Sequence, residues 1–343
     1  MKLSVLNLSL RHDDALLPTS AALLYVAAMY CGGFGLLLHA TWWSWPLGII
    51  AVAHSMVIAA YLVHECAHNA IFKESKHNAA LGRLLLWING ACYGDYEAIR
   101  HKHMRHHIDR ADVIAIDYRE LLLRHGWLRR IALALEALYV PAIDCLMHFL
   151  VMALPFTAPD YRAQRRRVVF CSIVRGSLLA ILLWYAWPAF VGYLIAYLLF
   201  EIVMRTMDMH QHTFEVFINL NIPRTLFKKE GVHFDKDYEQ RNTFSNTLGR
   251  GVLLNLLVLN FGYHNAHHEK PTSPWYRLPA LDKTLFGDDA TQTIPFRNIV
   301  KGYSKYRLRR VMNADHGDQA IGSGPDKGLG FVGVLGVSFL TAI

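Results

Sequence analysis

The sequence is poor in charge and in cysteine. Only 18% of its 343 residues are charged while 53% are hydrophobic, a balance that excludes an intrinsically disordered chain. Its mean hydropathy of +0.21 also argues against an ordinary water-soluble domain. The five cysteines show no paired spacing, so neither a disulfide framework nor a zinc ribbon is expected. No short apolar core followed by small residues lies near the N-terminus, and we therefore expect no secretory signal peptide.

Long apolar stretches without charged residues come in pairs. Residues 21–38 and 42–63 contain no Lys, Arg, Asp or Glu, and each is close to the roughly 20 residues that a membrane-spanning helix needs. Residues 168–204 are also largely apolar, but one helix of that length would measure about 55 Å, nearly twice the hydrocarbon thickness. Trp187-Pro188, near the middle, favours a break. The sequence therefore predicts an all-α integral membrane protein with four transmembrane helices in two hairpins.

Two further apolar segments are expected to lie at the membrane surface or to re-enter the membrane. Residues 79–94 are too short to span. Residues 131–155 are long enough, but as one helix they would carry Glu136, Asp144 and His148 on the same face. We therefore predict interfacial helices here, with a fifth span at 131–155 as the less favoured alternative.

The distribution of Lys and Arg predicts the orientation in the membrane. The short turns at 39–46 and 187–189 contain neither residue. Nearly all Lys and Arg fall in the long segments 73–130, 156–167 and 205–310. By the positive-inside rule these segments and both termini face the cytoplasm, which is the inner-membrane side in a bacterium. The net charge of +8 is then a consequence of topology and of contact with membrane lipids, and nucleic-acid binding is not expected.

The C-terminal end differs in composition from the rest. Residues 314–330 are rich in glycine and polar, and residues 328–343 are apolar but too short and glycine-rich to span a membrane. We predict a membrane domain over residues 1–313 and a loosely ordered tail over 314–343. On this interpretation the tail is dispensable for activity.

Histidine is abundant, with 19 residues, and much of it lies in three clusters. The clusters are His64-Glu-Cys-Ala-His68, His101-Lys-His103-Met-Arg-His106-His107 and His264-Asn-Ala-His267-His268. At the spacings i, i+3 and i+4 the imidazoles of each cluster share one helical face. Chance would produce on the order of 0.06 copies of HxxHH in such a chain. Because neutral imidazole binds iron, zinc, copper and nickel, the pattern predicts a metal site.

A fourth source of histidine follows the second apolar block. His210 and His212 are two residues apart and cannot share a helical face, and we favour His212 as a ligand because Asp208, four residues earlier, could support it. Nine ligands exceed the four of a structural zinc site and fit two metal ions. The nine are His64, His68, His103, His106, His107, His212, His264, His267 and His268.

The first cluster also matches HExxH, the motif of zinc metalloproteases. In that interpretation His64 and His68 bind zinc and Glu65 is the general base. A membrane zinc metalloprotease is therefore the alternative from a different class. It leaves both HxxHH clusters without a role.

Two other classes of metal site are possible. Glu65 with His68, and Glu230 with His233, match the ExxH pattern of soluble di-iron bundles, although Glu230 lies in a polar stretch. A metal transporter or sensor would place ligands near the bilayer midplane. Among the four predicted spans, the one histidine near the bilayer midplane is His54, in the first hairpin. We favour neither interpretation.

The order HxxxH, HxxHH and a distant HxxHH, among two hydrophobic hairpins, resembles the membrane-bound fatty acid desaturase superfamily. The sequence His-Glu-Cys-Ala-His is similar to the first box of acyl-lipid desaturases, and the resemblance covers about residues 20–280. It implies a helical membrane fold with a cytoplasmic histidine-rich cap, two non-haem iron ions and O2 as co-substrate. The box histidines match the family's ligands, and His212 matches least securely. His101 lies outside the pattern, and it remains with His210, Asp208 and Glu65 as a candidate to support the ligands.

The resemblance implies oxidation of an unactivated C–H bond in a fatty acid, acyl-lipid or acyl-carrier substrate. Desaturation ranks first, followed by oxidative decarboxylation of free fatty acids to terminal 1-alkenes, then hydroxylation and terminal acetylene formation. The His-Pro-Gly-Gly motif of cytochrome b5 is absent, so a separate ferredoxin, rubredoxin or cytochrome with its reductase would supply electrons. Arg100, Lys102, Arg105 and Arg110 could meet a substrate carboxylate, a carrier phosphate, an acidic redox partner or lipid headgroups.

Overall fold

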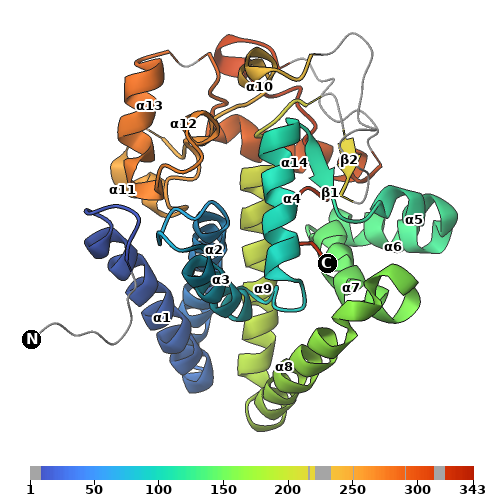
Figure 1. Cartoon of the computed structure of the whole chain (residues 1–343). Helices are drawn as coiled ribbons and strands as arrows, with labels where there is room; N and C mark the ends of the chain where they lie inside the picture. Colours follow the sequence, from blue (N-terminus) through green and yellow to red (C-terminus); the bar gives the residue numbers. More distant parts are fainter. Residues whose placement is uncertain (1–8, 215–216, 221–232, 250, 290, 313–320) are drawn as a thin grey trace, which may run out of the picture.

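Four long apolar helices form one half of the structure, a computed structural model that describes residues 9–214, 217–220, 233–249, 251–289, 291–312 and 321–343 (Figure 1). The first hairpin consists of α1 (Leu16–His39) and α2 (Ser44–Ala67). The second consists of α8 (Arg165–Tyr185), preceded by the 3-10 turn η1 (Pro159–Gln164), and α9 (Trp187–Asp208). All four are long and apolar enough to cross a membrane. This confirms the predicted helical membrane fold with two hairpins.

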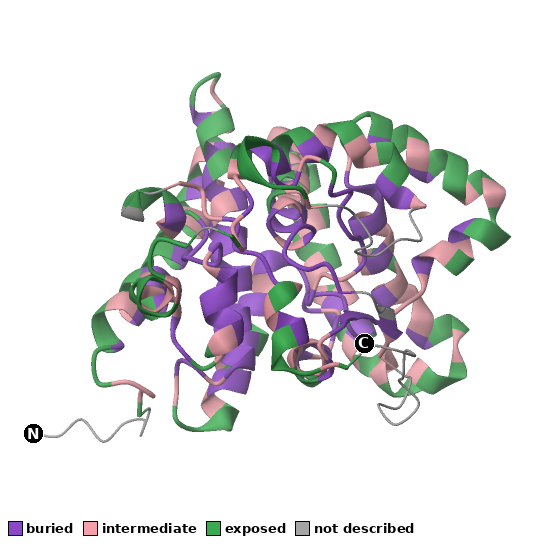
Figure 2. Cartoon of the chain, turned by 90° about the horizontal axis from the view of Figure 1, so that it is seen from above, coloured by how far each residue is buried: buried purple, intermediate pink, exposed green. Residues whose placement is uncertain are grey.

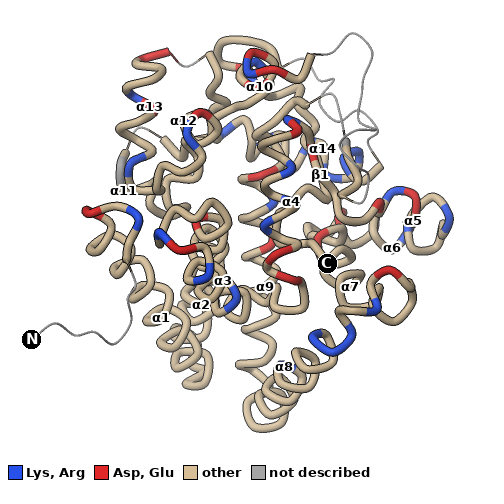
Figure 3. Tube along the Cα trace, viewed as in Figure 1, with Lys and Arg blue, Asp and Glu red and all other residues tan. Residues whose placement is uncertain are grey.

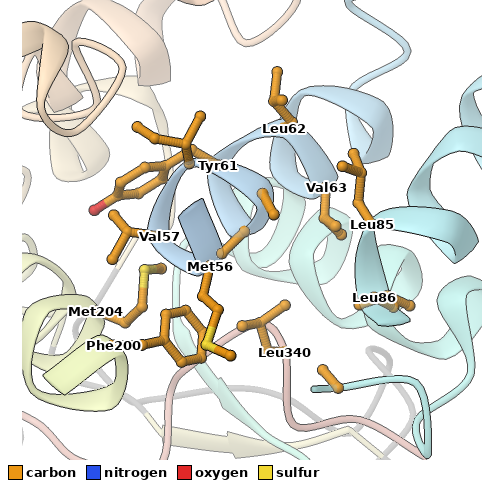
Figure 4. Packing of buried hydrophobic residues seen from close by; sticks show 14 of the residues in the cluster. Met56, Val57, Tyr61, Leu62, Val63, Leu85, Leu86, Phe200, Met204 and Leu340 are labelled. Carbon is orange, nitrogen blue, oxygen red and sulfur yellow. The ribbon is translucent and has the colours of Figure 1, made fainter. Parts of the chain in front are cut away.

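Helix α2 is the centre of the fold. Nearly every side chain from Val52 to Ala67 is buried, whereas α1 and α8 expose most of their apolar surface. Figure 2 shows buried residues gathered in the middle and exposed ones on the outer helices. In Figure 4, Met56 and Tyr61 of α2 lie among Phe200 and Met204 of α9 and Leu340 of the C-terminal segment. A charge-free sequence can be buried on all sides, so α2 can serve as a scaffold for ligands at its end.

Each hairpin turn has a local cause. Gly48 of α2 touches α1 so closely that a Cβ there would lie 2.9 Å from the backbone nitrogen of Leu37. In the second hairpin Pro188 occupies the first turn of α9, where its missing N–H costs nothing. Trp45 Nε1 donates to the Pro188 carbonyl at 2.8 Å and ties the two outer turns together.

A half-buried arginine of α8, Arg175, lies at the C-terminal end of the short helix α3 (Ser75–Asn89). Arg175 donates to the carbonyl of Trp87, in the last turn of α3, at 2.9 Å and also bonds the hydroxyl of Tyr193. Cations interact favourably with the free carbonyls at a helix C-terminus. The charge of Arg175 can therefore be accommodated within the apolar residues 168–204, because its guanidinium forms hydrogen bonds within the protein.

Residues 131–155 do not form one helix. The segment is divided between α6 (Gly126–Ala137) and α7 (Ala142–Thr157), because Pro141 disfavours helical geometry before it and offers no N–H. Neither piece is long enough to be a fifth span. Glu136 and Asp144 consequently do not share a helical face, and both bind Arg205 of α9 instead.

Most charged residues lie in the other half of the molecule (Figure 3), which is built from shorter elements (Figure 1). Two of these elements, α4 and α12, carry the HxxHH boxes. Strands β1 and β2 pair in parallel with Asp112 opposite Phe217. The elements are α4 (Tyr96–Asp109), β1 (Asp112–Ile114), α5 (Tyr118–Arg124), β2 (Phe217–Asn219), α10 (Lys236–Arg241), α11 (Val252–Leu256), α12 (His264–Glu269), η3 (Trp275–Arg277), α13 (Leu278–Phe286), α14 (Phe296–Val311) and η4 (Gly324–Asp326).

The expected loose ordering of the C-terminal tail does not hold for its last residues. Residues 313–320 lie outside the described part of the chain, but from Phe331 to Ala342 almost every residue is buried. Gly333 and Gly336 adopt φ of +86° and +81°, which residues with side chains rarely adopt. The apolar C-terminal segment, which is too short to span a membrane, is thus packed against the rest of the protein. The C-terminus lies near the centre of the molecule (Figure 1).

Candidate metal centre

Four elements bring the nine predicted histidines together. His64 lies in the last turn of α2 and His68 caps that helix. Helix α4 and helix α12 each carry one HxxHH box, and His212 follows the end of α9. The ends of α2, α4 and α9 and the short helix α12 meet in the same region of the molecule (Figure 1).

The histidines divide into two groups, each with its nitrogens within 4.8 Å of one another. The first group is His64, His68, His103, His107 and His267, and the second is His106, His212, His264 and His268. In the first group the Nε2 atoms of His68 and His103 are 2.6 Å apart and those of His107 and His267 are 3.2 Å apart. In the second group Nε2 of His212 lies 3.0 Å from that of His106 and 2.8 Å from that of His264.

Each HxxHH box contributes to both groups. The members four residues apart, His103 with His107 and His264 with His268, stay together, whereas the i+3 member lies in the other group. His106 therefore joins the second group and His267 the first. The prediction that a box directs all its imidazoles to one place is wrong in this detail, because adjacent helical residues point about 100° apart. The exchange places the two groups side by side, with the rings of His107 and His268 4.3 Å apart.

Burial keeps these imidazoles neutral. It lowers the pKa of His106 to about 4 and that of His267 to about 3, so their nitrogen lone pairs are free at neutral pH. Burial also lowers, well below the ordinary value, the pKa of His68, His103, His107, His212, His264 and His268.

The nitrogen positions fit metal ions. Metal–imidazole bonds of about 2.0–2.1 Å place neighbouring ligand nitrogens about 3 Å apart at right angles, close to the separations within both groups. Nε2 of His64 and Nε2 of His268 are buried and have no hydrogen-bond partner within the described part of the chain. An unpaired buried nitrogen is costly unless a ligand satisfies it. The donor set is therefore suited to two ions such as iron.

In three of the histidines the Nδ1 atom has a hydrogen-bond partner that fixes the orientation of the ring. His268 Nδ1 lies 2.8 Å from Glu239 Oε1, His106 Nδ1 lies 2.9 Å from the Ala111 carbonyl, and His212 Nδ1 lies 3.3 Å from Thr243 Oγ1. Such partners determine which nitrogen faces a metal and raise its basicity. Sequence reasoning did not find Glu239, because nothing in the polar segment around it indicates that it meets His268.

The four supporting candidates have different surroundings. His101 is exposed and lies outside both groups. His210 is buried, but its ring packs against Phe331 at 5.1 Å and it also belongs to neither group. Asp208 is half-buried and lines a cavity beside the histidines.

Glu65 is buried next to the first group. Its Oε2 accepts the backbone N–H of Trp275 at 3.0 Å, while Oε1 lies 3.8 Å from His64 Nδ1. The HExxH motif is thus part of a five-histidine group instead of a site with a single additional ligand. Glu230, from the other ExxH pair, lies outside the described residues.

A cavity of about 50 Å³ borders both groups. His103 of the first group and His106, His212 and His264 of the second line it, together with Asp112 and Asp208. A water molecule needs roughly 10–15 Å³ of such space. The cavity can therefore hold a few water-sized molecules but not an acyl chain.

Apolar helices long enough to span a membrane, with two buried histidine groups beyond their ends, define a helical membrane protein with a histidine-rich metal-binding site. The sequence model of the fatty acid desaturase family matches residues 40–299, a range that includes all nine histidines, and the chain belongs to this family. Comparison with curated protein sequences finds no significant match. Family membership supports an oxidoreductase that uses a fatty acyl substrate and a redox partner, and the histidine groups fit a di-iron centre.

Proposed function

We propose that this protein is a membrane di-iron enzyme that oxidises an unactivated C–H bond of a fatty acid or acyl chain, with desaturation as its reaction. The observation that carries the proposal is the pair of histidine groups, with five and four nitrogens. One iron ion is held by His64, His68, His103, His107 and His267, and the other by His106, His212, His264 and His268. When bound, the ions supply the activation of O2 that side chains alone cannot provide.

The balanced reaction requires an external reductant. A CH2–CH2 unit becomes CH=CH and gives up two hydrogens, while O2 with two further electrons and two protons forms two molecules of water. The electrons come from a separate ferredoxin, rubredoxin or cytochrome. Asp208 lines the cavity, and its Oδ1 has no hydrogen-bond partner among the residues that the structure describes, so it can hold a proton at that atom for transfer into the cavity.

The chain itself limits the space beside the histidines to about 50 Å³ and orients their rings. Glu239 and Ala111 keep Nδ1 of His268 and His106 occupied, which leaves Nε2 of each ring for a metal. Phe261 closes one side of the cavity against the apolar helices. A dry site strengthens electrostatic interactions and protects reactive species from side reactions.

The distribution of charge supports a cytoplasmic site. Basic residues gather in the half of the molecule that holds the histidines and at the start of α8 (Figure 3). The outer hairpin turns at Ala40 and Ala186 have no Lys or Arg nearby. The positive-inside rule assigns the histidine half and both termini to the cytoplasmic side.

One observation favours decarboxylation as a second candidate. The cavity is also lined by Lys102, whose buried amine lies next to His103 and can bind a free carboxylate by giving up its hydrogen bonds to Ser338 and Thr341. In that reaction a fatty acid, O2, two electrons and two protons give a terminal alkene, CO2 and two molecules of water.

Isotope-labelled fatty acids, supplied to membranes with a reductase system and followed by mass spectrometry, test the proposal. An internal double bond at unchanged chain length supports desaturation, and an alkene one carbon shorter with labelled CO2 supports decarboxylation. Glu65→Gln should retain activity, because glutamine can still accept the Trp275 N–H. Peptide cleavage without lipid oxidation, abolished in Glu65→Gln, would overturn the proposal in favour of a zinc protease.

A further inference from the structure

The last residues of the chain lie against the first histidine group. The ring of Phe339 is 5.8 Å from the ring of His64 and 5.8 Å from that of His103. Phe339 is itself buried. A residue near the C-terminus thus reaches side chains of α2 and α4, the helices that carry the first two boxes.

Buried cations anchor this segment at both ends. Lys102 Nζ donates to the carbonyl oxygens of Ser338 at 2.7 Å and Thr341 at 3.3 Å. Arg310 Nε donates to the carbonyl of Val332 at 2.5 Å. Because Lys102 directly precedes His103, the helix that carries the second box also fixes the position of the tail.

The segment lines the same cavity as the histidines. Val334, Val337 and Phe339 line it, together with Phe261. The remaining volume of about 50 Å³ is too small for an acyl chain, so the side chains of the tail limit how a chain can approach the histidines. The family match ends at residue 299 and does not include these residues.

From these contacts we propose that the side chains of Val334, Val337 and Phe339 form a wall of the substrate chamber, and that Phe339 is a specificity-determining residue. On this proposal, which rests on the proposed acyl-chain oxidation, the Phe339 ring limits how far a chain passes the metal ions and so selects the carbon that reacts. Apolar side chains in a binding site determine fit by shape, since they offer no directional bonds.

The test compares Phe339→Ala with Leu335→Ala in the full-length, iron-loaded protein. Leu335 is a matched control, because it is buried in the same segment but packs against Tyr118 and Val311, away from the cavity. With one labelled fatty acid, Phe339→Ala should yield products oxidised at least one carbon away from the wild-type position. Leu335→Ala should keep the wild-type position. Unchanged product positions in Phe339→Ala would overturn the specificity role.

A second measurement tests the wall without relying on catalysis. If Phe339 covers the first group, Phe339→Ala should lose iron to a water-soluble chelator several-fold faster than wild type, and Leu335→Ala should not. Equal rates in the two variants would refute the wall. A wild-type protein that binds iron but oxidises no acyl chain would instead contradict the proposed function.

A variant that fills the cavity tests the proposal even if Phe339→Ala does not fold. Val337→Phe adds bulk to a half-buried position on the cavity. It should retain iron, slow its loss to the chelator and reduce oxidation of long chains. Wild-type product positions and iron release in Val337→Phe would also count against the wall.

Discussion

Glu239 Oε1 lies 2.8 Å from Nδ1 of His268 and so links a carboxylate from α10 to the second histidine group. The same carboxylate accepts hydrogen bonds from Arg110 at 3.1 Å and Lys236 at 3.2 Å, which hold it in place. His268 therefore donates through Nδ1 and leaves Nε2, which has no hydrogen-bond partner among the described residues, available to a metal.

Replacement of Glu239 should weaken metal binding without removing a ligand. Loss of such a supporting partner typically costs about 10–100-fold in metal affinity, so Glu239→Ala should need correspondingly more iron for saturation. Glu120→Ala is the control, since Glu120 pairs with Arg124 on exposed α5. Iron titration of the purified proteins measures the effect, and identical affinity in both variants would disprove the role of Glu239.

Single histidine replacements should show that there are two separate metal positions. His267→Ala removes a ligand from the first group and His264→Ala one from the second, so each should lower the iron content by about half or more relative to wild type. The exposed His101 provides the control, and His101→Ala should keep the full iron content. Elemental analysis checks this, and loss of iron only in His101→Ala would refute the assignment.

The buried ion pairs of Arg205 should be important for folding. Arg205 Nη1 lies 2.8 Å from Glu136 Oε2, and Arg205 Nε lies 2.6 Å from Asp144 Oδ2. Arg205→Met leaves both carboxylates buried without their cation, which typically costs about 3–5 kcal/mol. Thermal unfolding in detergent should show a lower midpoint.

The exposed pair of Arg124 with Glu120 provides the comparison for Arg205. Surface pairs contribute about 0–1 kcal/mol, so Arg124→Met should leave the unfolding midpoint nearly unchanged. Equal midpoints for Arg205→Met and Arg124→Met would mean that burial of the network adds nothing to stability.

Deletion of residues 331–343 should prevent stable folding. The segment buries large apolar side chains, including Phe331, Leu335 and Leu340, and each contributes about 1.5–3 kcal/mol. Their sum approaches the total stability of many proteins, about 5–15 kcal/mol. Yield and size-exclusion behaviour in detergent measure the outcome. A truncated protein that is monodisperse and binds two irons would support the sequence-based expectation that the tail is dispensable.

The sequence by itself determined the four apolar spans and the spacing of the histidines within each box. Hydropathy adds up over about 20 adjacent residues, so each of the four spans was visible in its own segment. The spacing of His64 and His68, or of His103 and His107, is likewise a property of one helix, and both pairs stay together in the structure.

Only the tertiary structure decided which histidines share a group, because that depends on how α4 and α12 are rotated relative to each other. The i+3 members His106 and His267 are exchanged between groups for this reason. The contact of Glu239 with His268 joins segments 29 residues apart, and that of Lys102 with Thr341 joins segments 239 apart. Local periodicity carries no information about such distances. The C-terminal segment looked like a loose tail because its partners, Lys102 and the rings beside Phe339, are brought to it only when the helices pack together.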